Sequence, residues 1–255
     1  MATYKKKGQK KINKAPLEAV ESDSTTAEVF NTLDETASRS EQWIEKNQKP
    51  LFSTLLAVVV LILGYLAYTT YIQAPKELEA ANELAFPKDH FEKATSMNVA
   101  ADSIYNLALQ GSDGKYGFVN IAKKYKGTAA GNLANYYAGI SYLKTNDYQQ
   151  AIEYLEAFSS EDVLLGPTAL GAIGDAFANL NQAEDALEYY EKAARTKSNV
   201  ALTPLFLIKA ANTALELGAV EKAVELFTEV KEKYATTSAA KDIEMHINKA
   251  KYAQK

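Results

Sequence analysis

The chain has 255 residues, a formal net charge of −4 and no cysteine. The lack of cysteine excludes disulfides, thiol catalysis and cysteine-based metal sites. A weakly acidic chain has no overall field that attracts nucleic acid. Alanine and tyrosine are abundant, while glycine, proline and β-branched runs are scarce outside one apolar stretch. This composition predicts an all-α protein, with enough residues after that stretch for one domain with a core of its own.

Residues 1–23 are polar and rich in lysine, and they show no apolar periodicity. We expect them to form a disordered cytoplasmic tail. The lysines can act simply as a solvated topology signal. The sharper alternative is contact with anionic lipid headgroups or with ribosomal RNA, since clustered lysines attract both. Nucleic acid is otherwise not an expected partner.

Residues 24–49 are predicted to form an amphipathic juxtamembrane helix. Thr25 is followed three residues later by Glu28, which is the spacing of a capping box. The apolar residues then recur near helical spacing, at Val29, Leu33, Ala37 and Ile44. Such a helix would lie on the inner membrane surface or pack on a partner. A plain helical extension of the next segment is an equal alternative.

Residues 50–73 are predicted to be a transmembrane helix. No charged side chain occurs from Leu51 to Ile72. A bilayer core about 30 Å thick needs roughly 20 apolar helical residues. A buried soluble helix is usually shorter, and a signal peptide would lie nearer the start. The residues predicted to mark the lipid-facing segment are Leu51, Leu56, Val59, Leu63 and Leu66.

Lysine placement predicts the orientation of this helix. Lysines from Lys5 to Lys49 precede the span. After the span, Lys76 is followed at once by Glu77 and Glu79. The positive-inside rule therefore places the amino end in the cytoplasm and the long carboxyl part outside. We therefore expect a single-pass membrane protein with its carboxyl domain outside the cytoplasm.

Residues 75–109 should be helical, beginning at Pro75 and disturbed at Pro87, with a second apolar segment from Ile104 to Leu109. The stretch Gly111–Lys115 then breaks the helix. A phosphate-binding loop would need Ser or Thr after the lysine, and Tyr116 stands there, so we interpret the stretch as a turn.

The residues after Phe118 repeat. Three alanines, Ala151, Ala186 and Ala223, occupy matching positions at offsets of 35 and 37. A small residue precedes each by twelve positions, and a large one follows each by four. The small residues are Gly139, Gly174 and Ala211, and the large ones are Leu155, Tyr190 and Phe227. The pattern predicts helix–turn–helix units with small residues where two helices cross.

These units resemble the tetratricopeptide repeat, whose period is 34 residues. The early tryptophan and the final proline of that repeat are absent here. An echo at offset 109 relates Phe118, Ile121, Tyr125 and Thr128 to Phe227, Val230, Tyr234 and Thr237. It predicts a degenerate second helix over Tyr116–Tyr125 and a terminal first helix over Ser238–Tyr252. The expected architecture is therefore a transmembrane helix followed by an α-solenoid over residues 75–255.

No catalytic pattern is found, so we do not expect an enzyme, a cofactor or a metal. His90 and His246 are far apart in the sequence, and a catalytic zinc needs three protein ligands. Exposed, unliganded histidines are the simpler interpretation. There is neither a nucleophile elbow nor a glycine-rich phosphate loop.

The first helices of tetratricopeptide repeats line a concave groove. In this register, the resemblance predicts a partner-binding groove lined by Tyr136, Tyr137, Ile140, Lys144, Asp175, Asn179, Lys209, Asn212 and Glu216. Tyrosine and asparagine suit the capture of an extended peptide. As an alternative, Tyr136 and Tyr137 are ordinary aromatic residues of the core or of the surface.

The whole layout has a short cytoplasmic end, one span near residue 50, and repeats with Tyr136-Tyr137-Ala138-Gly139 and Ala151-Ile152-Glu153-Tyr154-Leu155. It resembles the YfgM-type family of ancillary SecYEG translocon subunits. The resemblance implies a non-catalytic scaffold beside the translocon, in contact with a membrane-anchored peptidyl-prolyl isomerase chaperone and emerging polypeptide. The alternative is a scaffold of another envelope complex, for division or outer-membrane assembly.

Overall fold

The computed structural model describes residues 32–33, 37–38, 41–97 and 101–252. These residues are helical or lie in turns, and none of them forms a strand. The chain divides into two units, Met1–Ala67 and Tyr68–Lys255. The predicted tail over residues 1–23 lies outside the described residues, as does half of the predicted juxtamembrane helix over residues 24–49. Of the latter, residues 41–46 are helical, with Trp43 and Ile44 exposed.

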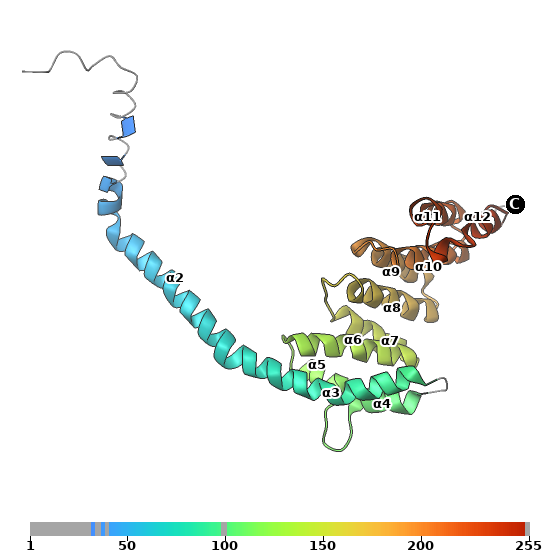
Figure 1. The fold of residues 1–255 in the computed structure, drawn as a ribbon, viewed down its shortest axis with the longest axis horizontal. Helices are drawn as coiled ribbons and strands as arrows, with labels where there is room; N and C mark the ends of the chain where they lie inside the picture. Colours follow the sequence, from blue (N-terminus) through green and yellow to red (C-terminus); the bar gives the residue numbers. More distant parts are fainter. Residues whose placement is uncertain (1–31, 34–36, 39–40, 98–100, 253–255) are drawn as a thin grey trace, which may run out of the picture. The chain divides into compact units, whose positions relative to one another are not determined.

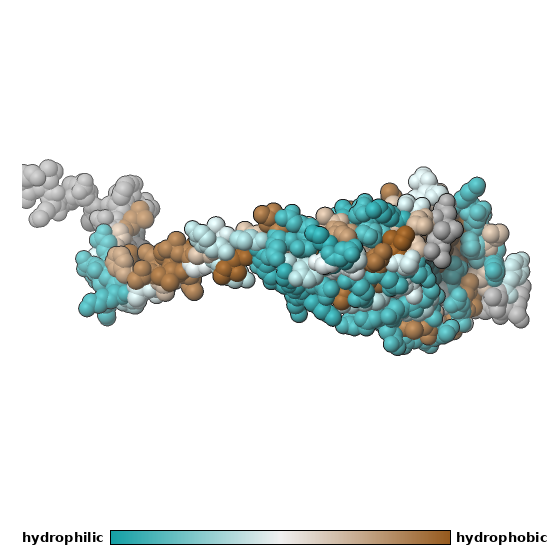
Figure 2. All heavy atoms as spheres, turned by 90° about the horizontal axis from the view of Figure 1, so that it is seen from below, coloured by the Kyte–Doolittle hydropathy of each residue, from teal (hydrophilic) through white to brown (hydrophobic). Residues whose placement is uncertain are grey.

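Helix α2 (Gln48–Tyr68) is long and apolar enough to cross a membrane. Large apolar side chains along it are exposed, including all five predicted lipid-facing residues. Figure 2 shows apolar side chains gathered on this segment. A helix that exposes apolar residues on all sides needs a nonpolar solvent, which a bilayer supplies.

Five residues of π-helix, η1 (Thr69–Gln73), are followed by α3 (Ala74–Ser96). The predicted disturbance at Pro87 is wrong, because α3 continues through this residue. Ala80, Leu84 and Ala94 are buried at helical spacing, and Pro87 lies buried on the same face. The ring therefore packs into the core, which offsets the loss of one backbone hydrogen bond.

The remaining helices of this unit form successive antiparallel pairs, each packed on its neighbours along the chain (Figure 1). Their bounds are α4 (Asp102–Gln110), α5 (Phe118–Lys124), α6 (Ala129–Lys144), α7 (Tyr148–Glu156), α8 (Leu165–Asn179), α9 (Ala183–Thr196), α10 (Thr203–Glu216), α11 (Val220–Lys233), the 3₁₀ turn η2 (Ser238–Ala240) and α12 (Ile243–Tyr252). The pairs α6–α7, α8–α9 and α10–α11 are the three repeats predicted from the alanines.

The predicted crossing points between paired helices are confirmed. Ala151, Ala186 and Ala223 are each 0% exposed. A Cβ added to Gly139 would lie 2.4 Å from Leu155 Cγ, and one added to Gly174 would lie 2.7 Å from the Tyr190 ring. The small residues thus allow the large residue four positions after each alanine to lie directly against the partner backbone.

The turns inside the three repeats share one backbone conformation. Asn146, Asn181 and Gly218 have φ of 62°, 58° and 73°, and they follow one another at the same offsets as the alanines. Asparagine and glycine are the residues that adopt this left-handed conformation most readily. Each turn therefore reverses the chain in the same way.

The echo at offset 109 also has a structural basis. The Thr128 hydroxyl donates to the Tyr125 carbonyl and the Thr237 hydroxyl to the Tyr234 carbonyl, both at 2.7 Å. Helix α5 therefore corresponds to α11. Helix α12 follows α11, after the short turn η2, as α6 follows α5. Residues at both ends of the solenoid repeat the same local design.

The first turns of α3 hold the loop between α5 and α6. The Glu77 carboxylate accepts from the backbone N–H groups of Ala129 and Ala130, at 2.8 and 3.0 Å. Glu79 accepts from the Tyr125 hydroxyl at 2.7 Å and from Lys124 at 3.0 Å. Both hydrogen bonds lower the pKa of Glu79, and the one from Tyr125 has the larger effect. We call the contacts of Glu77 and Glu79 the α3 clasp.

Candidate peptide-binding groove

Helices α6, α8 and α10 are the first helices of the three repeats, and local caps fix where α8 and α10 begin. Asp162 accepts from the backbone N–H groups of Leu164 and Leu165 before α8. Asn199 accepts from those of Ala201 and Leu202 before α10. The side chain of Asn199 also donates to the Val163 carbonyl of the preceding loop at 3.0 Å. Successive first helices are therefore kept in register.

Asp175 on α8 is the centre of a hydrogen-bonded cluster. Its Oδ1 accepts from the Tyr190 hydroxyl of α9 at 2.7 Å and from Lys209 Nζ of α10 at 2.5 Å. The Asp175 and Lys209 side chains are each 34% exposed. Burial is the larger cause and the hydrogen bond to Asp175 the second of a raised pKa of Tyr190, so that its hydroxyl remains a donor. The structure thus brings together two predicted groove residues from neighbouring repeats.

Four other predicted residues are exposed: Lys144, Asn179, Asn212 and Glu216. Asn179 donates to the Asp175 carbonyl one turn earlier in its own helix, at 2.8 Å. Together with the Asp175–Lys209 pair, this surface presents both signs of charge and exposed amide groups. Such groups suit the polar backbone of an extended peptide.

Tyr136, Tyr137 and Ile140 are only half-exposed. The Tyr137 ring stacks on Phe118 with centroids 5.2 Å apart and meets Phe91 edge-on at 5.0 Å. Tyr136 packs beside Phe158 at 5.2 Å, and Ile140 joins the neighbouring apolar cluster. These three residues therefore contribute packing between helices as well as any edge that they present to a ligand.

Tyr190 belongs to this cluster, although the repeat pattern predicts for it only a packing role. It is the large residue four positions after Ala186, where the other repeats have Leu155 and Phe227. The hydroxyl was the available signal, because a buried tyrosine normally needs a hydrogen-bond partner. That partner is Asp175, 15 residues earlier.

Histidine and carboxylate side chains are the potential metal ligands of this chain, which has no cysteine. Among the described residues, no group of three or more His, Asp or Glu side chains is placed to hold a metal. His90 is partly buried, with Nδ1 3.1 Å from the Phe86 carbonyl, and His246 packs on the Phe227 ring. The expectation that both histidines are exposed is therefore wrong.

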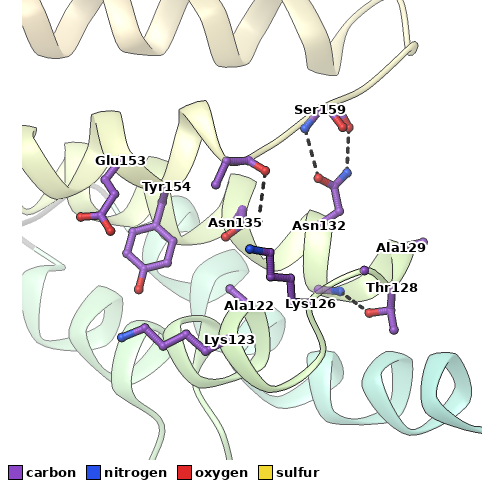
Figure 3. Close-up of a pocket in the computed structure, with 13 residues that line it drawn as sticks. Ala122, Lys123, Lys126, Thr128, Ala129, Asn132, Asn135, Glu153, Tyr154 and Ser159 are labelled. Carbon is purple, nitrogen blue, oxygen red and sulfur yellow. Dashed lines mark hydrogen bonds between the residues drawn. The ribbon is translucent and has the colours of Figure 1, made fainter. Parts of the chain in front are cut away.

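A hollow that was not predicted from the sequence lies between α5, α6 and α7 (Figure 3). It has a volume of about 630 Å³. The polar side chains that line it include Lys123, Lys126, Asn135 and Glu153. At one edge, Asn132 donates to the Ser159 carbonyl at 2.7 Å and accepts from the Ser159 N–H at 3.1 Å. The lining residues come from three consecutive helices and the turns that follow α5 and α7, so no single motif marks the hollow.

A family model described as "Tetratricopeptide repeat" matches residues 136–201 of the chain. The match covers most of α6, all of α7, α8 and α9, and the loop that leads to α10. Together with the paired helices, it supports a tetratricopeptide-repeat protein. A comparison with curated proteins gives no match. All-helical repeat proteins of this kind are typically non-catalytic scaffolds that bind other proteins.

Proposed function

We propose that this protein is a membrane-anchored scaffold that binds a protein partner in the groove formed by α6, α8 and α10. The observation that carries the proposal is the Asp175–Lys209 pair, which is held by Tyr190 and is bordered by exposed Asn212 and Glu216. A fixed charge pair next to exposed amides gives both register and backbone hydrogen bonding to an extended chain.

Helix α2 is proposed to be the anchor. Its exposed apolar side chains need a nonpolar solvent, and the sequence before it begins with a cluster of lysines between Lys5 and Lys14. The proposed topology has the amino end in the cytoplasm and the repeats in the periplasm of a bacterial inner membrane. Protease added outside spheroplasts should then degrade the repeats. Protection of the repeats in intact spheroplasts would contradict this topology.

The proposed location is beside the SecYEG translocon, with a membrane-anchored prolyl isomerase chaperone and emerging polypeptide as partners. The layout of the sequence supports this proposal. Tethering would raise the concentration of the groove near the exit site of the translocon. The alternative is a scaffold of a division or outer-membrane assembly complex, since the same groove chemistry serves any extended partner.

Purification of the full chain in mild detergent, followed by mass spectrometry, tests this assignment. Recovery of SecYEG with a prolyl isomerase supports the translocon. Recovery of an intact complex of division or outer-membrane assembly proteins without SecYEG would favour the alternative.

The groove is tested by the double variant Asn212→Ala/Glu216→Ala. Both side chains are exposed on α10, so the melting temperature should stay close to that of the wild type, while partner recovery should fall severalfold. A matched control, Gln149→Ala/Glu225→Ala, changes exposed residues on the second helices α7 and α11 and should not affect recovery. Equal loss in both variants would place the partner elsewhere.

A further inference from the structure

We propose that the hollow between α5, α6 and α7 binds an acidic segment of a polypeptide partner. The site is separate from the predicted groove, whose lining residues occupy other positions of α6 and the helices α8 and α10. It is formed by the carboxyl end of α5, the first half of α6 and the second half of α7 with the residues that follow it.

The charge of the hollow comes from two lysines. Lys123 and Lys126 lie three residues apart and thus on one face of α5 and the turn that follows it. Among the described residues, neither of their ammonium groups makes an ion pair or a hydrogen bond. Their neighbour Lys124 points to the other side, where it pairs with Glu79 of the α3 clasp. The two lysines therefore offer an unneutralised pair of charges to a ligand.

Neutral donors complete the lining. The Asn135 amide uses one N–H on the Ala157 carbonyl, at 3.4 Å, and keeps the other. The Tyr154 ring is buried against Tyr142, and its hydroxyl points to the side where Lys123 lies (Figure 3). Burial raises the pKa of Tyr154, so this hydroxyl remains protonated and can donate. Lys126 extends towards Asn135 in the same view.

The amino end of α6 is not itself an anion site. The N–H groups of Ala129 and Ala130 donate to Glu77, and that of Gly131 donates to the Thr128 hydroxyl at 2.9 Å. A phosphate is usually held by such backbone groups, and here they are occupied. What remains are flexible lysines and an amide, which suit carboxylates spaced along a peptide backbone.

One carboxylate in the hollow has the same charge as the proposed ligand. Glu153 of α7 lines the hollow, and the only described hydrogen bond of its side chain is accepted from Gln150 Nε2 at 3.1 Å. Its carboxylate repels an acidic peptide. The site therefore predicts opposite effects of two substitutions: removal of the lysines weakens binding, and neutralisation of Glu153 strengthens it.

The test measures binding of a fluorescein-labelled peptide of alternating Asp, Glu and Gly by anisotropy, using the full chain in detergent. Lys123→Ala/Lys126→Ala should weaken binding about tenfold, because two exposed charge pairs are lost. Glu153→Gln should tighten it severalfold. Lys123→Arg/Lys126→Arg keeps both charges and should retain binding. The matched control Lys241→Ala/Lys249→Ala removes two exposed lysines elsewhere and should leave binding unchanged.

Four outcomes would overturn the inference. The first is equal weakening of peptide binding by the control variant, which would indicate that the peptide is attracted by the positive charges of the whole surface. The second is equal binding of a peptide in which Asn and Gln replace the acids. The third is the absence of any tightening by Glu153→Gln. The fourth is displacement of the peptide by inorganic phosphate at matched concentration, which indicates a small-anion site. Failure here is distinguishable from failure of the groove, since Asn212→Ala/Glu216→Ala should not change acidic-peptide binding.

Discussion

The close approach of paired helices depends on glycines, which lack a Cβ atom at the crossing point. Gly174 lies so near Tyr190 that an added Cβ would be 2.7 Å from its ring. Replacing a glycine in an exposed helix by alanine stabilises a protein by about 0.5–1 kcal/mol. At Gly174 we expect the opposite sign: Gly174→Ala should lower the free energy of unfolding by about 1–3 kcal/mol, because the Tyr190 ring must move.

Thermal unfolding followed by circular dichroism measures this effect. Gly64→Ala is the matched control, because Gly64 is helical and no atom lies within 4 Å of the position that an added Cβ would take. The control should leave the unfolding of the repeats unchanged. Stabilisation by Gly174→Ala would mean that the two helices do not cross at this residue.

The sequence predicted contacts of residues within one repeat better than contacts between repeats and their surroundings. The small residue and the large residue of each pair recur with the period, so their meeting could be inferred. Tyr137 is different, because its ring is covered by Phe118 of α5 and Phe91 of α3. Those neighbours lie outside the three clear repeats, and periodicity carries no information about them.

At the scale of the elements, α3 stabilises the start of α6. Free N–H groups in the first turn of a helix need acceptors, and Glu77 supplies two carboxylate oxygens to Ala129 and Ala130. Glu77→Ala should therefore lower the free energy of unfolding by about 1 kcal/mol, as the loss of a helix cap does. Amide hydrogen exchange at Ala130 should also become faster.

Urea unfolding provides the measurement. Glu92→Ala on the same helix is the control, because Glu92 forms only an exposed pair with Lys88 at 3.6 Å among its described contacts. Such pairs contribute a few tenths of a kcal/mol. If the two variants are equally stable, the Glu77 contact does not cap α6.

Helix positions were mostly predictable because alanine-rich apolar stripes and polar turns alternate along the chain. Pro87 shows the limit of this reasoning. Proline usually interrupts a helix, but here it takes its place between Leu84 and Ala94 on the buried face of α3. Tertiary burial outweighs the local penalty, and a single sequence does not show what covers a given face.

For the whole molecule, acid should destabilise the repeats. The Tyr125 hydroxyl lowers the pKa of Glu79, and the backbone N–H of Leu165 lowers the pKa of Asp162. A carboxyl with a lowered pKa in the folded state binds fewer protons there than in the unfolded state. Its stabilisation is therefore present above the unfolded pKa and is lost as the pH falls through the folded value.

We expect the free energy of unfolding to fall as the pH is lowered from about 5 to about 3. Glu79→Gln should reduce this slope, whereas Glu225→Gln, at an exposed position of α11, should keep it. Urea titrations across this pH range provide the comparison. An unchanged slope in Glu79→Gln would show that the clasp carboxylate does not contribute to it.

The paired helices of the repeats could be predicted from the sequence, whereas the hollow between α5, α6 and α7 could not. Its lining combines Lys126, Asn135 and Glu153, which belong to no shared period. Such a site exists only once three helices have assembled. The Asp175–Lys209 contact lies between these cases, because both residues were placed in the groove and only their direct pairing had to come from the structure.

The recurring left-handed turns at Asn146, Asn181 and Gly218 have a consequence for how such a chain can change length. Excising residues 147–181 would join Asn146 to the residue that normally follows Asn181, so that one bend substitutes for another. The splice would remove a single module and shorten the surface offered to a ligand, without requiring any new joint. Gain or loss of a whole module is thus the change of length that this backbone accommodates most simply.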